Sequence, residues 1–312
     1  MIIHHIIDVH EWHVAEIGHH HIIVPLPILL VNKGQLYCFL SNKLEPKEGS
    51  DAKEYGEFHY SHGHFEAKDG SKVYDFSITK NTAAMFLSVA VLLVVFLNVA
   101  GAYKRTEGKA PKGLQSFLEP IVLFVRDDIA KASIGAKYER FLPFLLTIFF
   151  FILVNNIFGL IPFFPFGANV TGNVAVALVL ATFTFLVTNF SGNKTYWAHI
   201  FLPDVPKGLY ILLVPIEIIS VFLKPFVLMV RLFANITAGH IIILGFFSLI
   251  FIFGEMSQGL GYGVSVFSVA FTLFMSFLEL LVAFLQAYVF TLLSALYFGA
   301  AVEEHGHHEH DA

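Results

Sequence analysis

Long apolar runs separated by polar segments divide the chain. Residues 82–103 carry no charge and end at Lys104 and Arg105, and residues 141–158 and 174–190 are also uncharged. About 20 apolar residues in a helix cross a hydrocarbon core about 30 Å thick. The pattern therefore predicts three membrane-spanning helices before residue 191.

The last third contains two apolar runs, residues 209–254 and 260–298, that are too long for perpendicular spans. As helices they would be about 69 and 58 Å long at about 1.5 Å per residue. Each run is either two spans joined by a turn or one steeply tilted helix. Four charged residues interrupt the two runs: Glu217, Lys224, Arg231 and Glu279. Because such side chains need a protein interface or a water-filled cavity beside them, we expect a long tilted antiparallel hairpin.

The polar connector between the first two runs is basic. It carries eight Lys or Arg residues: Lys104, Arg105, Lys109, Lys112, Arg126, Lys131, Lys137 and Arg140. The loop at residues 162–173 carries none. The positive-inside rule therefore places the connector and the C-terminus in the cytoplasm and the N-terminus outside. Apolar residues recur at helical spacing between residues 114 and 125, which predicts a helix that lies along the membrane surface or packs on a partner and does not span.

Residues 1–80 form a polar, histidine-rich region. Two turn signals, at residues 32–34 and 68–71, separate segments in which apolar and polar positions alternate. The pair Asp69-Gly70 is a typical hairpin signal. We therefore predict a small β-rich region outside the membrane. Its histidines form either a metal site or a solvated surface that titrates near neutral pH. They are His4, His5, His10, His13, His19, His20, His21, His59, His62 and His64.

The composition is that of a membrane protein. Of 312 residues, 56% are hydrophobic and 14% are charged, against about 25% charged in an average soluble domain. The net charge of −5 argues against nucleic acid as a partner, and the single cysteine, Cys38, leaves no intrachain disulfide. The predicted fold class is an all-α polytopic membrane protein with about five membrane helices and a small β-rich N-terminal region. The predicted parts are the region 1–80, the membrane domain 81–300 and a disordered, acidic, histidine-rich tail, 301–312.

A polar stripe runs along the first long helix. At 100° per residue, Glu217, Lys224 and Asn235 lie within about 40° of Arg231, whereas His240 points to the opposite side. Arginine keeps its charge at any accessible pH and is costly in the middle of a bilayer. A chain that keeps an arginine there is expected to use the fixed charge.

The predicted hairpin also has a predicted register. In an antiparallel pair, residues at one depth have a constant sum of residue numbers. The sum is 517 for Arg231 with Gln286 and 519 for His240 with Glu279. The two sums differ by less than one helical turn, so both pairs are compatible with a single register of the hairpin.

The segment RLFANITAGH, from Arg231 to His240, is similar to the R-L-x-x-N-x-x-A-G-[EH] segment of subunit a of the F-type ATP synthase. Gln286 and Glu279 resemble the glutamine and the titratable partner of that family's last helix. Residues 156–162 and 169–171 resemble its second-helix exit and the loop that follows. The resemblance extends from residue 81 to 298, and His240 with Glu279 occurs in the swapped order known in other members.

This resemblance implies a proton-translocating, non-catalytic stator subunit in a bacterial inner membrane, without a cofactor. The implied partners are a ring of c subunits, the subunit b stalk, the remaining ATP synthase subunits and the lipid bilayer. Arg231 would deprotonate the c-ring carboxylate and separate two aqueous half-channels, so that proton flow drives ring rotation and ATP synthesis. Protons would enter past His240 and Glu279 and leave near Glu217. The implied translocation residues are Glu217, Ser220, Lys224, Arg231, Asn235, His240, Glu279 and Gln286.

Other roles remain open for some of these residues. Arg231 has a purely structural alternative, an ion pair with Glu217 or Glu279. The Lys224 side chain could instead extend to the membrane interface. Asn235 and Gln286 could instead form hydrogen bonds that join neighbouring helices.

The sequence gives less support to two other functions for the whole chain. A stand-alone secondary transporter, for example for a metal ion, is the alternative function, but the sequence lacks the internal repeat of such proteins. An intramembrane enzyme is the third function, but the sequence contains no GxSxG, HExxH or paired aspartate motif.

The predicted topology can be tested with single cysteines at residues 61 and 133 in a Cys38→Ser background. An impermeant maleimide applied to intact cells should label Ser61→Cys and leave Ser133→Cys unlabelled, because the basic connector is predicted to be cytoplasmic. Labelling at 133 and not at 61 would reverse the orientation.

Overall fold

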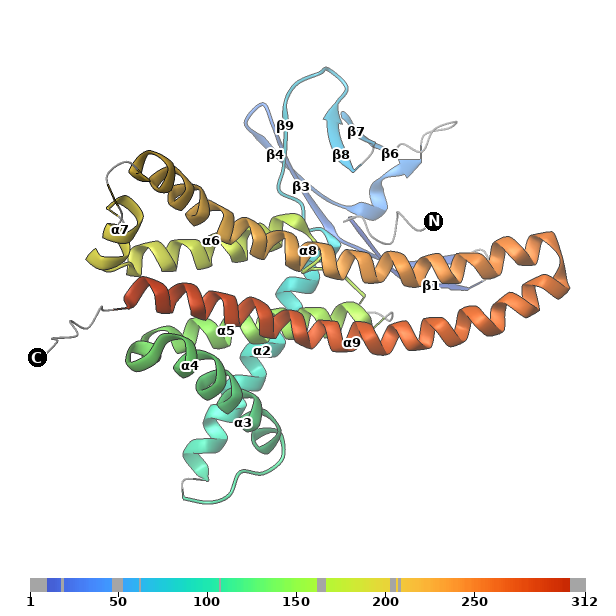
Figure 1. Cartoon of the computed structure of the whole chain (residues 1–312). Helices are drawn as coiled ribbons and strands as arrows, with labels where there is room; N and C mark the ends of the chain where they lie inside the picture. The colour runs from blue at the N-terminus through green and yellow to red at the C-terminus, as the bar shows by residue number, and fades with distance from the viewer. Residues whose placement is uncertain are drawn as a thin grey trace, which may run out of the picture.

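The computed structural model describes residues 10–17, 20–46, 53–61, 63–106, 108–161, 167–202, 206 and 209–303. Strands occupy the N-terminal part of these residues and helices occupy the rest (Figure 1). The strands are β1 (Glu11–Ile17), β2 (His20–Pro25), β3 (Pro27–Asn32), β4 (Gln35–Leu40), β5 (Glu45–Pro46), β6 (Lys53–Tyr55), β7 (Phe58–Ser61), β8 (His64–Ala67) and β9 (Val73–Asp75). The helices are α2 (Lys80–Arg105), α3 (Leu114–Phe124), the π-helix η2 (Val125–Lys131), α4 (Ala132–Ile134), α5 (Tyr138–Leu160), α6 (Val174–Ser191), α7 (Lys194–Phe201), α8 (Tyr210–Met256) and α9 (Gln258–Val302).

The predicted β-rich region is present as three antiparallel sheets, β1-β2, β4-β3-β9 and β5-β6-β7-β8. Lys33 and Gly34 form the β3–β4 turn with φ of 49° and 80°, as expected for a two-residue hairpin. The predicted hairpin around Asp69-Gly70 is wrong, because β9 pairs with β3 and not with β8. The turn at Asp69 is instead held against the β3–β4 turn, where Ser71 Oγ accepts from Asn32 Nδ2 at 2.7 Å and Lys33 bonds the Asp69 carboxylate.

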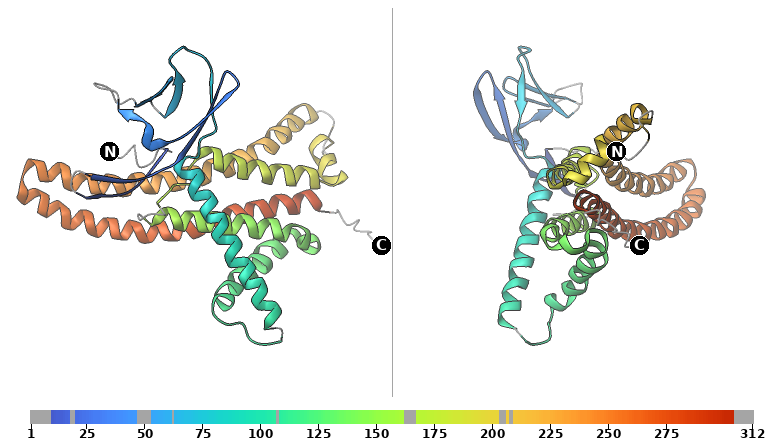
Figure 2. Two further views of the ribbon diagram at one scale, coloured as in Figure 1. Left: turned by 180° about the vertical axis from the view of Figure 1, so that it is seen from behind. Right: turned by 60° about the vertical axis from the view of Figure 1, so that its left-hand side comes forward.

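The three shorter spans are confirmed as α2, α5 and α6. Together with the two long helices, they make five helices in the described residues that are long and apolar enough to cross a membrane. Each long run is one continuous helix, so the alternative of two spans with a turn does not hold. Helices α8 and α9 lie side by side along their length, and α2 crosses this hairpin steeply (Figures 1 and 2). If α2 runs along the membrane normal, the α8–α9 hairpin is therefore steeply tilted from that normal.

The predicted register of the hairpin is confirmed at Gly239. A Cβ atom built on Gly239 would lie 2.5 Å from Glu279 Oε1. The sum of these residue numbers, 518, falls between the two predicted sums of 517 and 519. The backbone of α8 at Gly239 thus faces the Glu279 side chain directly.

The connector helix packs on other helices of this chain. Leu118, Val125, Ile129 and Ala130 are buried in the main core, which includes residues of α5, α6, α8 and α9. At the end of the segment, a Cβ atom on Gly299 of α9 would lie 2.1 Å from the carbonyl oxygen of Ser133. Whether this segment lies along the membrane surface stays a prediction.

Small residues bring the membrane helices into close contact. Ala177 and Ala181 of α6 and Ala287 and Ala295 of α9 are fully buried. Small side chains at such contacts let helix backbones approach closely, which is how helices associate where lipid competes for apolar surface. Larger side chains such as Phe290 fill the remaining core space.

The β region and the loop after α5 lie at the same end of α2. Trp12 and Leu26 form one apolar cluster with Ala84 of α2 and with Ala168 and Val170 of the loop. The connector begins at the other end of α2 (Figure 1). This arrangement agrees with placing the β region and the connector on opposite sides of a membrane.

Candidate functional site

The polar stripe of α8 is built on one continuous helix. Glu217, Lys224 and Arg231 follow one another at intervals of seven residues, so that they share one face. Arg231 is exposed. Glu217, Arg231 and Glu279 are all described residues, and no ion pair joins Arg231 to either carboxylate. The structural ion-pair alternative for Arg231 is therefore not what the structure contains.

Two tyrosines accompany this stripe. Lys224 Nζ lies 5.5 Å from the centroid of the Tyr297 ring, which is within the range of a cation–π contact. Tyr196 is buried, and burial raises the pKa of its hydroxyl, as does the nearby charge of Glu217. The Tyr196 hydroxyl therefore stays protonated near neutral pH and can donate a hydrogen bond. Ser220, one turn after Glu217, is half-buried.

Exposed apolar side chains flank the exposed Arg231 on α8. Val227 lies one turn before Arg231 on the same side of the helix, and Val230 immediately precedes it. Val227 is 43% exposed and Val230 is 40% exposed. An apolar surface of this kind needs lipid or an apolar partner to cover it. The guanidinium thus lies in a surface that is otherwise suited to hydrocarbon.

The facing helix contributes two buried polar side chains. Glu279 and Gln286 of α9 are 9% and 2% exposed, and their spacing of seven residues places them on one face. Asn235 and His240 belong to α8, but their side chains lie outside the described residues. The expected bond between His240 and Glu279 therefore stays a prediction, although Gly239 places the backbone before His240 against Glu279.

A hydrogen-bond network fixes the loop after α5 beside this pair of helices. Asn156 Nδ2 donates to the carbonyl oxygen of Ala283 at 3.0 Å, and Thr171 Oγ1 donates to Asn156 Oδ1 at 2.5 Å. Ala283 lies midway along α9 between Glu279 and Gln286. Asn156 therefore joins α5, α9 and the loop, the interhelical role that a buried asparagine commonly has in a membrane protein.

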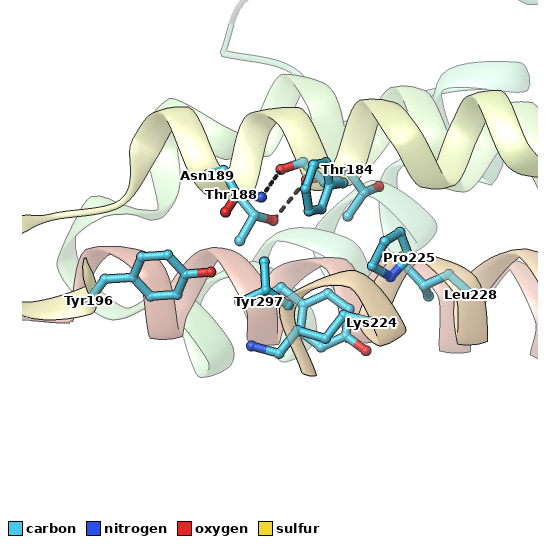
Figure 3. Close-up of a pocket in the computed structure, with 10 residues that line it drawn as sticks. Thr184, Thr188, Asn189, Tyr196, Lys224, Pro225, Leu228 and Tyr297 are labelled. Carbon is cyan, nitrogen blue, oxygen red and sulfur yellow. Dashed lines mark hydrogen bonds between the residues drawn. The ribbon is translucent and has the colours of Figure 1, made fainter. Parts of the chain in front are cut away.

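Sequence reasoning missed Tyr297, Tyr196 and Asn189, which line a small cavity beside Lys224 (Figure 3). Tyr297 follows Gln286 by eleven residues, a spacing that returns to the same helix face. That spacing was a usable signal. Asn189 reaches the cavity because α6 packs on α8, and the turn between α6 and α7 brings Tyr196 there. No periodicity in the sequence indicates either contact.

The histidine-rich region has few described histidine side chains. Three of the ten are described: His10, His59 and His64. His10 Nε2 lies 3.5 Å from Asp75, and His59 Nδ1 lies 3.3 Å from Glu54. In the described part of the chain, no group of three His, Cys, Asp or Glu residues could hold a metal ion. The metal hypothesis for the other histidines stays open.

Comparison with known proteins gives the family that the sequence motifs resemble. The family described as ATP synthase A chain matches residues 83–299, and a domain of unknown function matches residues 1–86. An ATP synthase subunit a from Chloroherpeton thalassium is 48% identical over 244 residues, covering 76% of this chain and 71% of that protein. An ATP synthase subunit a 2 from Prosthecochloris aestuarii is 48% identical over 240 residues, covering 75% and 71%. An ATP synthase subunit a from an Anaeromyxobacter species is 40% identical over 263 residues, covering 80% and 61%.

Five apolar helices and a long hairpin with intramembrane charges define a polytopic membrane protein of the ion-transporting kind. The chain belongs to the ATP synthase A chain family. Membership makes it a multi-pass membrane subunit of the proton-translocating Fo sector, which serves ion transport and ATP synthesis.

The close contact at Gly239 gives a testable prediction. Gly239→Ala would place a methyl group 2.5 Å from Glu279 Oε1 and so displace the buried carboxylate. The Glu279 side chain can move aside, so the main effect is a misplaced carboxylate, and we expect ATP-driven proton pumping in membrane vesicles to fall about fivefold or more, a barrier change of about 1 kcal/mol. Gly245→Ala is the matched control on α8, because nothing lies within 4 Å of a Cβ atom there. Equal pumping by both variants would show that Glu279 does not need its position.

Proposed function

We propose that Arg231 is the fixed charge that makes each carboxylate of a c-subunit ring release its proton. A carboxylic acid in lipid stays protonated because desolvation disfavours the anion, and a guanidinium within a few ångströms reverses this preference. The same cation blocks the direct passage of protons and so separates two aqueous half-channels. Ring rotation then couples the proton flow to ATP synthesis.

The observation that carries this proposal is the setting of Arg231. It is exposed, it has no ion pair with Glu217 or Glu279, and the exposed apolar side chains of Val227 and Val230 flank it on α8. A charge left available in an apolar surface is costly unless a partner brings an opposite charge to it. An apolar ring that carries one carboxylate per subunit at mid-membrane fits this surface.

The remaining polar residues suggest two proton routes, an outer route for entry and an inner route for exit. Glu279 with His240 would form the outer route, because both belong to the half of the hairpin beyond Arg231, toward the turn between α8 and α9. Glu217, Ser220 and Lys224 would form the inner route, because they precede Arg231 on α8. Asn235 and Gln286 lie at depths near Arg231 in the hairpin register and would help to position the ring carboxylate.

The proposed assembly includes the c ring, the subunit b stalk and the other ATP synthase subunits, in a bacterial inner membrane. The subunit itself would be non-catalytic, because the ATP chemistry would belong to other subunits. The basic connector favours a cytoplasmic C-terminus and an outer β region. The domain boundaries at residues 80 and 300 stay predictions.

A stand-alone transporter is the alternative function, and membership in the ATP synthase A chain family weighs against it. Purification from membranes in mild detergent separates the two. Copurification with a ring of small hydrophobic subunits would support the stator role, whereas a monodisperse single chain would support a transporter.

The charge of Arg231 is tested by two substitutions. Arg231→Ala should lower ATP-driven proton pumping and ATP synthesis in vesicles by more than about tenfold, a barrier change of about 1.4 kcal/mol. Arg231→Lys should not restore normal coupling, because a desolvated lysine loses its proton more readily and lacks the planar fork that meets a carboxylate at two points. Normal pumping by Arg231→Ala would reduce the residue to a structural charge.

The proposed relay between His240 and Glu279 is tested by exchanging the two groups. His240→Ala or Glu279→Ala alone should slow proton-driven synthesis without loss of the assembled complex, because either change breaks the relay. His240→Glu combined with Glu279→His should recover much of the rate, since the same groups then share the same gap. The rates of the four proteins form a double-mutant cycle. Additive losses without recovery would mean that the two residues act separately.

A further inference from the structure

A small cavity lies where α6, α7, α8 and α9 meet (Figure 3). The centre of a water molecule can occupy about 10 Å³ of it, which is about the space that one ordered water needs. Most of its surface is apolar, and the lining residues whose side chains carry a polar group are Thr184, Thr188, Asn189, Tyr196, Lys224 and Tyr297. The cavity is therefore a candidate for a single bound water.

Two buried oxygen atoms at the cavity lack a hydrogen-bond partner among the described residues. They are the hydroxyl of Tyr196, a residue that is 8% exposed, and Asn189 Oδ1. The Asn189 amide is fixed, because Nδ2 donates to the Phe185 carbonyl oxygen at 2.7 Å. Figure 3 shows the Tyr196 hydroxyl pointing into the space between α6 and Tyr297. Buried polar atoms in proteins are almost always paired, with ordered water where no protein group is available.

Lys224 supplies the third polar group. Its ammonium has three donors and no acceptor, and its flexible stem does not fix its position. The Tyr297 ring lies 5.5 Å from Nζ, and the charge of Glu217 acts on both Lys224 and Tyr196. The titratable groups around the cavity are thus Tyr196 of α7, Glu217 and Lys224 of α8, and Tyr297 of α9.

We propose that one ordered water in this cavity joins Asn189 and Tyr196 to the Lys224 ammonium. The ammonium and the tyrosine hydroxyl donate to the water oxygen, and the water donates to Asn189 Oδ1. Asn189 and Tyr196 are then positioning residues that hold the Lys224 charge beside Glu217. This inference rests on the proposed function, because the positioned charge belongs to the inner route.

The first test is Tyr196→Phe in the complete ATP synthase in membrane vesicles. The variant removes one oxygen and keeps the packing of the ring. We expect the rate of ATP-driven proton pumping to fall about fivefold, which corresponds to about 1 kcal/mol, with an unchanged amount of assembled complex. Asn189→Leu should give a similar loss. Tyr262→Phe is the matched control, because Tyr262 is 76% exposed near the hairpin turn, and its rate should equal that of the wild type.

The second test asks whether the effect passes through Lys224. Lys224→Gln should itself lower the pumping rate, and Tyr196→Phe should add no further loss in that background. A merely structural role for Tyr196 would lower the rate by the same factor with or without Lys224. The proposal is overturned by additive losses, by a normal rate in Lys224→Gln, or by normal rates in both Tyr196→Phe and Asn189→Leu.

The outcome can be separated from that of the proposed function by including Arg231→Ala in the same assay. If Arg231→Ala stops pumping while Tyr196→Phe pumps normally, only the water site is wrong. If Arg231→Ala pumps normally, the proposed function itself fails and the inference fails with it.

Discussion

The cost of placing a charged side chain in hydrocarbon constrains the last two helices. Glu217, Lys224 and Arg231 recur every seventh residue on α8, so that a single face carries all three charges. A helix with such a face cannot be surrounded by lipid, and it must present that face to protein or to water. In the structure, the α8–α9 hairpin gives Lys224 a tyrosine ring and leaves Arg231 exposed.

The two halves of the hairpin meet this constraint differently. Beyond Arg231, contact is close: a methyl group on Gly239 would lie 2.5 Å from the Glu279 carboxylate, and Asn156 joins α5 to α9 through a hydrogen bond. Before Arg231, a small cavity lies next to Lys224, where α6, α7, α8 and α9 meet. A close contact on one side and a cavity on the other would suit two proton routes that must not connect directly.

Much of this arrangement could be predicted from the sequence, because it depends on local periodicity. Apolar run lengths gave the five candidate membrane helices, and helical geometry gave the charged face and the hairpin register. The pairing of β9 with β3 could not be obtained in this way, since it depends on contacts between two turns, Lys33 with Asp69 and Asn32 with Ser71. The connector was predicted to contact the membrane surface or a partner because an apolar helix face does not specify what covers it. Its neighbours in the structure include α9, which begins more than a hundred residues later.

The residues of the candidate site also fall into those that the sequence could predict and those that it could not. Arg231 and Glu279 could be identified because an ionisable residue inside an apolar run is conspicuous in any sequence. Tyr196 is not conspicuous, since it lies in a short helix outside the long runs, and only the turn between α6 and α7 brings it to Lys224. At that turn, a Cβ atom on Gly192 would lie 2.7 Å from Cδ1 of the Tyr196 ring. The residue that shapes the surroundings of Lys224 is thus a glycine with no chemistry of its own, and its importance follows from the space that it leaves.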